Sequence, residues 1–331
     1  MPGKPKVLLD KAMSGKQLEA AEIKELLSYP VLSEESFYLQ YAARKMNEGC
    51  GEAEIHGQVG VNTSACPCNC AFCSFAASNK IFRGQQVQKL TDIVEQCKSM
   101  ESAGANAIYL MATANMDFPA YIQIGAEVRR HLDESTILVA NTGDFQYQEA
   151  LALKEAGFNG VYHALRLGEG VVTRIAPHKR LETMQAAHRA GLRLGTCLEP
   201  VGPEHSLDEL VEKILITREA QAVFSGAARR IPIPETELSE LGKVSEARMA
   251  QIVAVVRLAT GYSVPGNCTH EPNVSGVIAG ANLLWAEIGS NPRDTVANTE
   301  NNRGFDVKKC REILVEADCQ VLDGPSKFFQ R

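Results

Sequence analysis

The chain has 331 residues, of which 45% are hydrophobic and 22% are charged, and its 34 basic and 40 acidic residues give a formal net charge of −6. This is the composition of a globular protein that can bury a large core. The acidic balance argues against a general nucleic-acid-binding protein, which needs a basic face. No run of about 18 apolar residues is present, so we expect no membrane span.

The ten cysteines need an explanation. Residues 1–17 carry no apolar signal-peptide core, so we expect a cytoplasmic protein in which cysteines stay reduced. They would then serve as core residues, metal ligands or nucleophiles rather than form disulfides. Four of the ten fall within residues 66–73, a clustering that scattered core cysteines would not show.

The N-terminal part, up to about residue 50, predicts helices, because apolar residues recur at three- and four-residue spacing over 17–29 and 33–46. From residue 54 onward, short runs rich in Val, Ile and Leu alternate with amphipathic helical stretches. The predicted strands are 55–62, 107–111, 136–140, 160–165, 193–200, 222–231 and 262–267. The predicted helices among and after them are 91–102, 121–132, 147–156, 181–190, 207–220, 246–259, 274–288 and 307–317.

This alternation of strands and helices predicts an α/β fold with a parallel sheet and crossover helices. The number of repeats favours a (β/α)8 barrel of the TIM type, full or nearly full, over a doubly wound sheet. We divide the chain into an N-terminal helical segment (1–52), the barrel (53–288) and a C-terminal extension packed on the barrel (289–331). In such a barrel the chemistry lies on the loops that follow the carboxyl ends of the strands.

The first predicted strand leads directly into the cysteine-rich loop 63–73, TSACPCNCAFC. Cys66, Cys70 and Cys73 have the spacing C-x3-C-x2-C. Three thiolates on one loop can hold three irons of a [4Fe–4S] cube, which leaves the fourth iron open for reaction. The alternatives are chance or a structural zinc site that also uses Cys68. Four zinc ligands on so short a loop would be cramped, because zinc sites usually take ligands from separate segments.

This loop resembles the signature of the radical S-adenosylmethionine (SAM) superfamily. The resemblance extends over most of the chain and is closest to the group of biotin synthases, biotin-synthase-like lipoyl synthases and hydrogenase-maturation enzymes. It implies a [4Fe–4S] cluster whose open iron binds the amino and carboxylate groups of SAM. It also implies one-electron cleavage of SAM to methionine and a 5′-deoxyadenosyl radical, which abstracts an unactivated hydrogen from the substrate.

The resemblance also implies SAM-binding residues. Segment 178–197 matches the fourth helix and fifth strand of the group, where Arg180 would bind the SAM carboxylate. Phe72 would pack on the adenine side, and Val201 with Gly202 would lie against the ring. Residues after the second, third and fourth strands would complete the ring around SAM: Ala112, Thr113, Asn141, Asp144, Arg166 and Glu169. Taken singly, the polar members of this set also fit solvated loop positions.

Cysteines outside the loop bear on the reaction. Sulfur-inserting members of the group consume an auxiliary iron–sulfur cluster, and Cys197 stands where biotin synthases have one of its ligands. The other ligands of that site are replaced in this chain. We expect a differently ligated auxiliary cluster on Cys268, Cys310 and Cys319, together with Cys197. Buried packing is the alternative, since free cysteine behaves as a small hydrophobic residue.

Three further residues would lie at the barrel mouth. Arg229 and Arg230, at the end of the sixth strand, would clamp a substrate carboxylate, or else form a surface pair. His270 would orient the substrate or ligate iron, or else be a hydrogen-bonded structural histidine.

The sequence therefore predicts a radical SAM sulfurtransferase. It would insert sulfur at unactivated C–H positions of a small-molecule or carrier-bound acyl substrate, as in lipoyl or biotin synthesis. We expect an electron donor such as flavodoxin or ferredoxin, and neither a nucleic acid nor a membrane as partner.

One alternative is a maturation or rearrangement enzyme with a single cluster, of the hydrogenase-cofactor or methylornithine type. The other is a scaffold that binds zinc.

Overall fold

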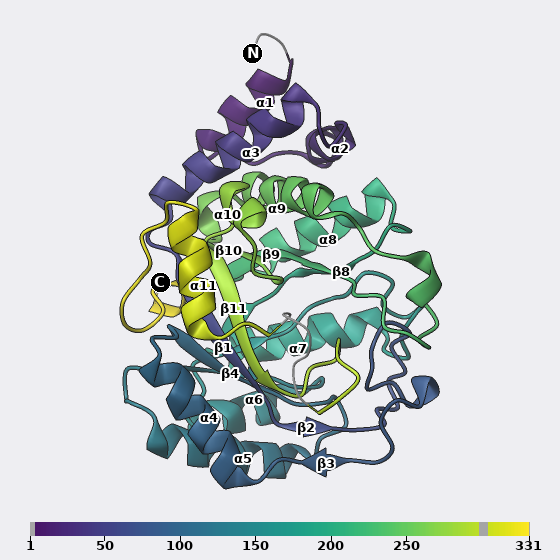
Figure 1. Cartoon of the computed structure of the whole chain (residues 1–331), viewed down its shortest axis with the longest axis vertical. Coiled ribbons are helices and arrows are strands. Elements are labelled where there is room, and N and C mark those ends of the chain that lie inside the picture. The colour runs from purple at the N-terminus through teal and green to yellow at the C-terminus, as the bar shows by residue number, and fades with distance from the viewer. Residues whose placement is uncertain (1–3, 298–303, 331) are drawn as a thin grey trace.

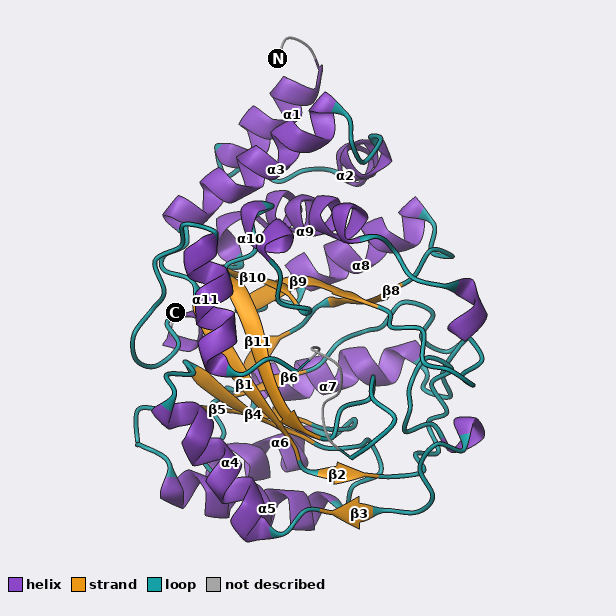
Figure 2. Cartoon of the chain, viewed as in Figure 1, coloured by secondary structure: helices purple, strands orange, loops and turns teal. Residues whose placement is uncertain are grey.

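The computed structural model describes residues 4–297 and 304–330. Strands lie at the centre of the molecule (Figure 2), and their parallel pairings close them into a ring. The strands, in order around the ring, are β1 (Glu54–Gly60), β4 (Ala107–Met111), β5 (Ile137–Asn141), β6 (Gly160–Tyr162), β7 (Arg193–Gly195) with β8 (Leu198–Val201), β9 (Phe224–Arg229), β10 (Gly266–Thr269) and β11 (Leu283–Gly289). Both β7 and β8 pair with β9, so they are two parts of the fifth strand position, and β11 pairs back with β1. This confirms the predicted (β/α)8 barrel.

Helices connect the strands and form the outer layer (Figure 1). They are α4 (Leu90–Ser102), α5 (Phe118–His131), α6 (Tyr147–Glu155), α7 (Pro177–Arg189), α8 (Leu207–Glu219), α9 (Glu246–Thr260), α10 (Val274–Ile278) and α11 (Val307–Glu316). Side-chain caps begin several of them, since Ser206, Ser245 and Asp306 each accept a backbone N–H of the first turn. These local signals explain why the predicted and observed helices agree closely through residue 260.

Three helices precede the barrel: α1 (Lys4–Met13), α2 (Ala20–Ser28) and α3 (Glu34–Met46). They pack against α8 and α9, and Leu26 and Leu39 share one apolar cluster with Val253 of α9. Figure 1 shows these helices together at one end of the molecule. The sequence predicted the second and third of them, while the division of the chain at residues 52 and 288 stays a prediction.

The predicted helix 274–288 is wrong. Helix α10 ends at Ile278, the chain turns at Gly280 with φ at +102°, and the eighth strand β11 follows. Nearly all of β11 is buried, and a strand buried on both faces has a continuous apolar run that resembles a buried helix. The predicted strand 262–267 also shifts, because Gly261–Ser263 forms a short 3-10 helix and β10 begins at Gly266.

The C-terminal segment closes the amino end of the barrel. Phe328 and Phe329 join the apolar cluster that fills the barrel interior. The buried Glu54 accepts hydrogen bonds from the Lys327 N–H at 2.8 Å, from the Phe328 N–H at 3.3 Å and from the Ser326 hydroxyl. None of the described helices has the length and apolar character needed to span a bilayer.

Candidate active site

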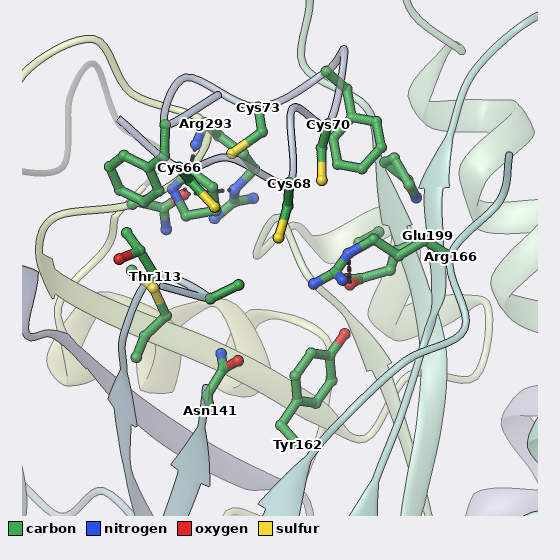
Figure 3. A pocket seen from close by; sticks show the side chains of 18 of the residues that line it. Cys66, Cys68, Cys70, Cys73, Thr113, Asn141, Tyr162, Arg166, Glu199 and Arg293 are labelled. Atoms are coloured by element: carbon green, nitrogen blue, oxygen red, sulfur yellow. Dashed lines mark hydrogen bonds and ion pairs between the residues drawn. The ribbon is translucent and has the colours of Figure 1, made fainter. Parts of the chain in front are cut away.

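A cavity opens at the carboxyl ends of the strands (Figure 3). Residues of the cysteine loop form one wall: Cys66, Cys68, Cys70, Phe72 and Cys73. Residues from β4, β5, β6, α7 and the loops between them form a second wall: Ala112, Thr113, Asn141, Arg166 and Arg180. Tyr162 and Trp285 also line the cavity, together with Arg229, Arg230, His270 and Arg293 on the side of β9 to β11. The cavity therefore brings together most of the residues that the sequence predicted for a SAM site.

The cysteine loop is fixed by backbone hydrogen bonds on several sides. The Cys66 N–H donates to the Phe75 carbonyl at 2.6 Å, and the Ala71 N–H donates to the Val172 carbonyl at 2.8 Å. The loop after β11 adds a bond from the Ser74 N–H to the Pro292 carbonyl at 2.9 Å. Figure 3 shows the four sulfur atoms of the loop directed into one space.

The thiols of this loop differ in their readiness to ionise. The hydrogen bond between the Cys66 and Cys68 thiols lowers the pKa of Cys66 and raises that of Cys68, and burial raises the pKa of Cys68 further. Burial raises the pKa of Cys70, and the charges of Arg166 and Arg180 partly offset this rise. The thiols of Cys66, Cys70 and Cys73 converge, and the pKa of Cys66 is lowered. The guanidinium groups of Arg166 and Arg180 lie near them. This arrangement fits the ligand set of a [4Fe–4S] cluster with an open iron.

The zinc alternative receives no support from the geometry. Across residues 4–297 and 304–330, no three His, Cys, Asp or Glu side chains are close enough together to hold a single metal ion. Cys68 lines the cavity beside the three motif cysteines.

Arg180 lies at the start of α7 and is held by two carboxylates. Its Nε donates to Glu169 Oε2 at 3.1 Å, and its Nη1 donates to Asp144 Oδ1 at 3.1 Å. Asp144 also pairs with His163 Nε2 at 2.9 Å. Burial lowers the pKa of His163 to about 4, so this ring is neutral near pH 7. The sequence predicted Asp144 and Glu169 as residues around SAM. In the structure they do not line the cavity; instead they position Arg180, which does.

Arg166 pairs with Glu199 across the cavity wall, with Nε and Oε1 3.3 Å apart (Figure 3). Burial opposes ionisation of Arg166, but the charges of Glu199 and Glu169 raise its pKa overall. Glu199 was not among the predicted site residues. Strand alternation from Cys197 does not mark it, because residues 196 and 197 fall in the break between β7 and β8.

The remaining predicted SAM residues divide into two groups. Thr113 and Asn141 line the cavity and are fixed by neighbours on β1 and on the short strand β2 (Asn62–Thr63): Asn62 Nδ2 donates to Thr113 Oγ1 at 2.7 Å, and Asn141 Nδ2 donates to Gln58 Oε1 at 2.9 Å. Phe72 and Ala112 also line the cavity. Val201 is not among the residues that line the cavity and packs in the apolar cluster formed with α8 and α9, so its contact with the adenine stays a prediction.

The four cysteines predicted for an auxiliary cluster do not converge. Cys197 and Cys268 meet inside the barrel, with their sulfur atoms 2.9 Å apart. Cys310 lies on α11 outside the barrel wall, where its thiol donates to the Trp285 carbonyl at 3.3 Å (Figure 1). Cys319 accepts a hydrogen bond from Arg44 Nη1 at 2.8 Å beside α3. The predicted four-cysteine set is therefore wrong, because the chain places these thiols on opposite sides of the barrel wall.

Opposite charges pair along the wall formed by β9, β10 and β11. Arg229 Nε donates to Glu271 at 2.6 Å, and Arg230 Nη2 donates to Glu204 at 2.7 Å. Both arginines line the cavity as predicted, but each already has a carboxylate partner. A carboxylate of the substrate would therefore have to compete with a residue of the chain at either arginine.

Glu287 lies at the centre of the same wall. It accepts hydrogen bonds from Arg293 Nη2 at 2.6 and 2.8 Å and from Gln58 Nε2 at 3.3 Å, and its Oε1 lies 3.1 Å from His270 Nε2. Burial raises the pKa of Glu287, but Arg293 and His270 more than offset this effect and lower it overall. Glu287 was not among the predicted site residues, because it falls in the segment 274–288 that was predicted as a helix.

Comparison with known proteins agrees with this geometry. The radical SAM superfamily model matches residues 62–215. The chain is 21% identical over 248 residues to a biotin synthase of Rickettsia felis, a match that covers 72% of this chain and 78% of that protein. It is 22% identical over 265 residues to a biotin synthase of Acetivibrio thermocellus, covering 77% and 81% of the two chains.

Two solved structures share the whole fold. Methylornithine synthase (PylB) superposes with a TM-score of 0.79 at 18% identity, covering 98% of both chains. The FeFe-hydrogenase maturase HydG from Carboxydothermus hydrogenoformans superposes with a TM-score of 0.79 at 17% identity, covering 99% of this chain and 81% of HydG. The cysteine loop, the cavity above the barrel and these comparisons lead to one conclusion: this chain carries a radical SAM domain over residues 62–215 and is related to the biotin synthases.

Proposed function

We propose that this enzyme abstracts hydrogen from an unactivated carbon of a cofactor precursor and that sulfur is inserted at that carbon. The observation that carries this proposal is the contact between Cys197 and Cys268, whose sulfur atoms lie 2.9 Å apart inside the barrel. The two thiols share one apolar cluster with Tyr162 and Trp285, which line the cavity. Two thiols therefore lie next to the chamber in which a radical would form, as a sulfur-inserting enzyme requires.

The residues of the loop and of α7 have defined tasks in this proposal. Cys66, Cys70 and Cys73 would ligate the [4Fe–4S] cluster, and Arg180 would bind the carboxylate of SAM. When bound, the cluster and SAM supply the 5′-deoxyadenosyl radical. The C-terminal segment packs across the amino end of the barrel, opposite the cavity, and Glu54 anchors it there.

We propose that one thiol of the Cys197–Cys268 pair carries the sulfur to be inserted as a persulfide, which an external persulfide donor would supply. Transfer of the outer sulfur to the substrate carbon radical would leave a thiyl radical, which the one-electron donor would reduce to the thiolate. An iron–sulfur cluster needs four ligands, and the structure brings together only two of the four predicted cysteines. The predicted auxiliary cluster does not fit, so we derive no step through it. The proposal also requires two partners: a small or carrier-bound acyl substrate, and a one-electron donor such as flavodoxin or ferredoxin.

The test compares Cys197→Ser and Cys268→Ser with the wild type and with Cys319→Ser as a matched control outside the barrel. Each anaerobically reconstituted protein is assayed for 5′-deoxyadenosine and for thiolated product, with an octanoylated carrier protein and with dethiobiotin. We expect 5′-deoxyadenosine from all four proteins and thiolated product only from the wild type and Cys319→Ser. Unchanged thiolation in Cys197→Ser and Cys268→Ser would refute the assignment. A wild type that forms 5′-deoxyadenosine but no thiolated product would refute sulfur insertion.

A second function is favoured by the paired charges of the cavity. Arg166, Arg229, Arg230 and Arg293 each face a carboxylate, and walls of alternating charge suit a small polar substrate better than an alkyl chain. This observation favours a maturation or rearrangement enzyme with a single cluster. Such an enzyme would hold about four irons per chain and form no thiolated product.

A further inference from the structure

His270 lies on the cavity wall and has no role in the proposed formation of the radical. It follows the last residue of β10, and its side chain is 14% exposed. The imidazole packs against the indole of Trp285, with ring centroids 5.5 Å apart and an interplanar angle of 35°. Both residues line the cavity, so His270 is placed to contact whatever the cavity holds.

Glu287 fixes which nitrogen of His270 carries the proton. A carboxylate accepts hydrogen bonds and does not donate them, and Glu287 Oε1 lies 3.1 Å from His270 Nε2. Glu287 stays ionised because Arg293 donates to both of its oxygens. The hydrogen bond to Glu287 therefore selects the tautomer with its proton on Nε2, and in that tautomer Nδ1 is the nitrogen that can accept a hydrogen bond.

We propose that Nδ1 of His270 accepts a hydrogen bond from a neutral amide or ureido N–H of the substrate. The positive charge of Arg293 favours a neutral substrate group over a cationic one at this position. Arg293 and His270 share Glu287, so a second cation such as a substrate ammonium would be repelled. The arginines of this wall supply only donors, and their carboxylate partners are already engaged. The inference rests on the proposed function, since octanoylated lysine and dethiobiotin both carry neutral N–H groups.

The sequence provides a direct reporter for this test, because Trp285 is the single tryptophan of the chain and packs on His270. Reconstituted enzyme with SAM and no reductant is titrated with octanamide and with methyl octanoate, and Trp285 fluorescence is followed. The two probes share the acyl chain and the carbonyl group, but only octanamide has N–H donors. We expect octanamide to bind about 3- to 10-fold more tightly, which is the effect of one hydrogen bond between neutral groups.

Variants at position 270 test the role of the acceptor. His270→Leu should remove the preference for octanamide, and His270→Gln should restore most of it, because the amide oxygen of glutamine also accepts. His188→Gln is the control, since His188 lies exposed on α7 and bonds to the Ala220 carbonyl outside the cavity.

Three results would overturn the inference. They are equal affinity of the wild type for octanamide and methyl octanoate, an unchanged preference in His270→Leu, and tighter binding of octylammonium than of octanamide. The failure of sulfur insertion is distinguishable from these results. An enzyme that makes no thiolated product but still prefers octanamide through His270 would refute the proposed function and leave the recognition of the N–H group standing.

Discussion

The sulfur atoms of Cys197 and Cys268 lie 2.9 Å apart, although their strand positions are separated by β9. Gly226 is the residue of β9 that pairs with Cys268, and its backbone has φ at +128°. A Cβ atom at Gly226 would lie 2.1 Å from the Cys268 carbonyl oxygen and 2.4 Å from the Cys268 nitrogen. Glycine at this position therefore permits the close approach of β9 and β10 on which the thiol contact depends.

Gly226→Ala tests this dependence. The new methyl group would collide with the backbone of β10 and would also occupy a strained φ, so we expect a loss of stability of about 2 kcal/mol or more. Separation of the strands should also reduce cross-linking of Cys197 and Cys268 by a short bifunctional thiol reagent under denaturant-free conditions. Urea unfolding and mass spectrometry of the cross-linked peptides measure the two effects. A variant with wild-type stability and wild-type cross-linking would contradict this account.

Arg180→Lys tests the SAM carboxylate site. A lysine provides a point charge and cannot bond to Glu169 and Asp144 while presenting a planar fork to a ligand. We expect SAM affinity to fall about 10-fold or more, which corresponds to about 1.4 kcal/mol. Isothermal titration calorimetry of the reconstituted enzyme without reductant measures this affinity. Lys179→Ala, a change at the exposed neighbouring residue, is the control and should bind SAM normally.

His163 makes stability depend on pH. Burial lowers the pKa of His163 to about 4, whereas an unfolded histidine titrates near pH 6.5. Between these values the unfolded chain binds more protons than the folded chain, so the contribution of His163 is complete above about pH 6.5 and is lost as the pH falls toward 4. The full contribution is at most about 3 kcal/mol. Urea unfolding between pH 4.5 and 7 should show this slope, and His163→Gln should flatten it; an equal slope in the variant would be evidence against it.

Phe328→Ala tests the plug at the amino end of the barrel. Phe328 is 2% exposed, and its removal leaves a cavity among the aromatic rings around His56. We expect a loss of about 3–5 kcal/mol in the free energy of unfolding, measured by chemical denaturation. Lys327→Ala is the matched control at an exposed neighbour and should cost less than about 1 kcal/mol, because its ion pair with Glu52 lies on the surface.

Periodicity and capping made most of the fold predictable. The strand candidates around residues 107–111 and 193–200 lie where the structure has β4, β7 and β8, because local apolar runs there coincide with barrel strands. Strand β11 was missed because burial on both faces removes the alternation that marks a strand. The error is a physical one: a fully buried strand and a buried helix have similar apolar runs.

The candidate site was predictable where its residues are close in sequence. Cys66, Cys70 and Cys73 lie on one loop, so their spacing alone indicates their chemistry. Pairs such as Arg166 with Glu199 join different strands, and their meeting depends on tertiary packing that no local pattern encodes. The cysteines at 310 and 319 were misassigned for the same reason, since sequence spacing does not tell on which side of the barrel wall a thiol lies.

The central claim is that the loop cysteines form the radical-generating centre, and the most direct test compares the wild type with a Cys66→Ala/Cys70→Ala/Cys73→Ala variant. Both proteins are reconstituted anaerobically and assayed for iron and for reductive cleavage of SAM to 5′-deoxyadenosine. We expect the variant to lose about four irons per chain and all SAM cleavage. Any iron that remains in the variant would be iron bound by other residues of the chain, including Cys197 and Cys268. SAM cleavage by the variant at the wild-type rate would contradict the account.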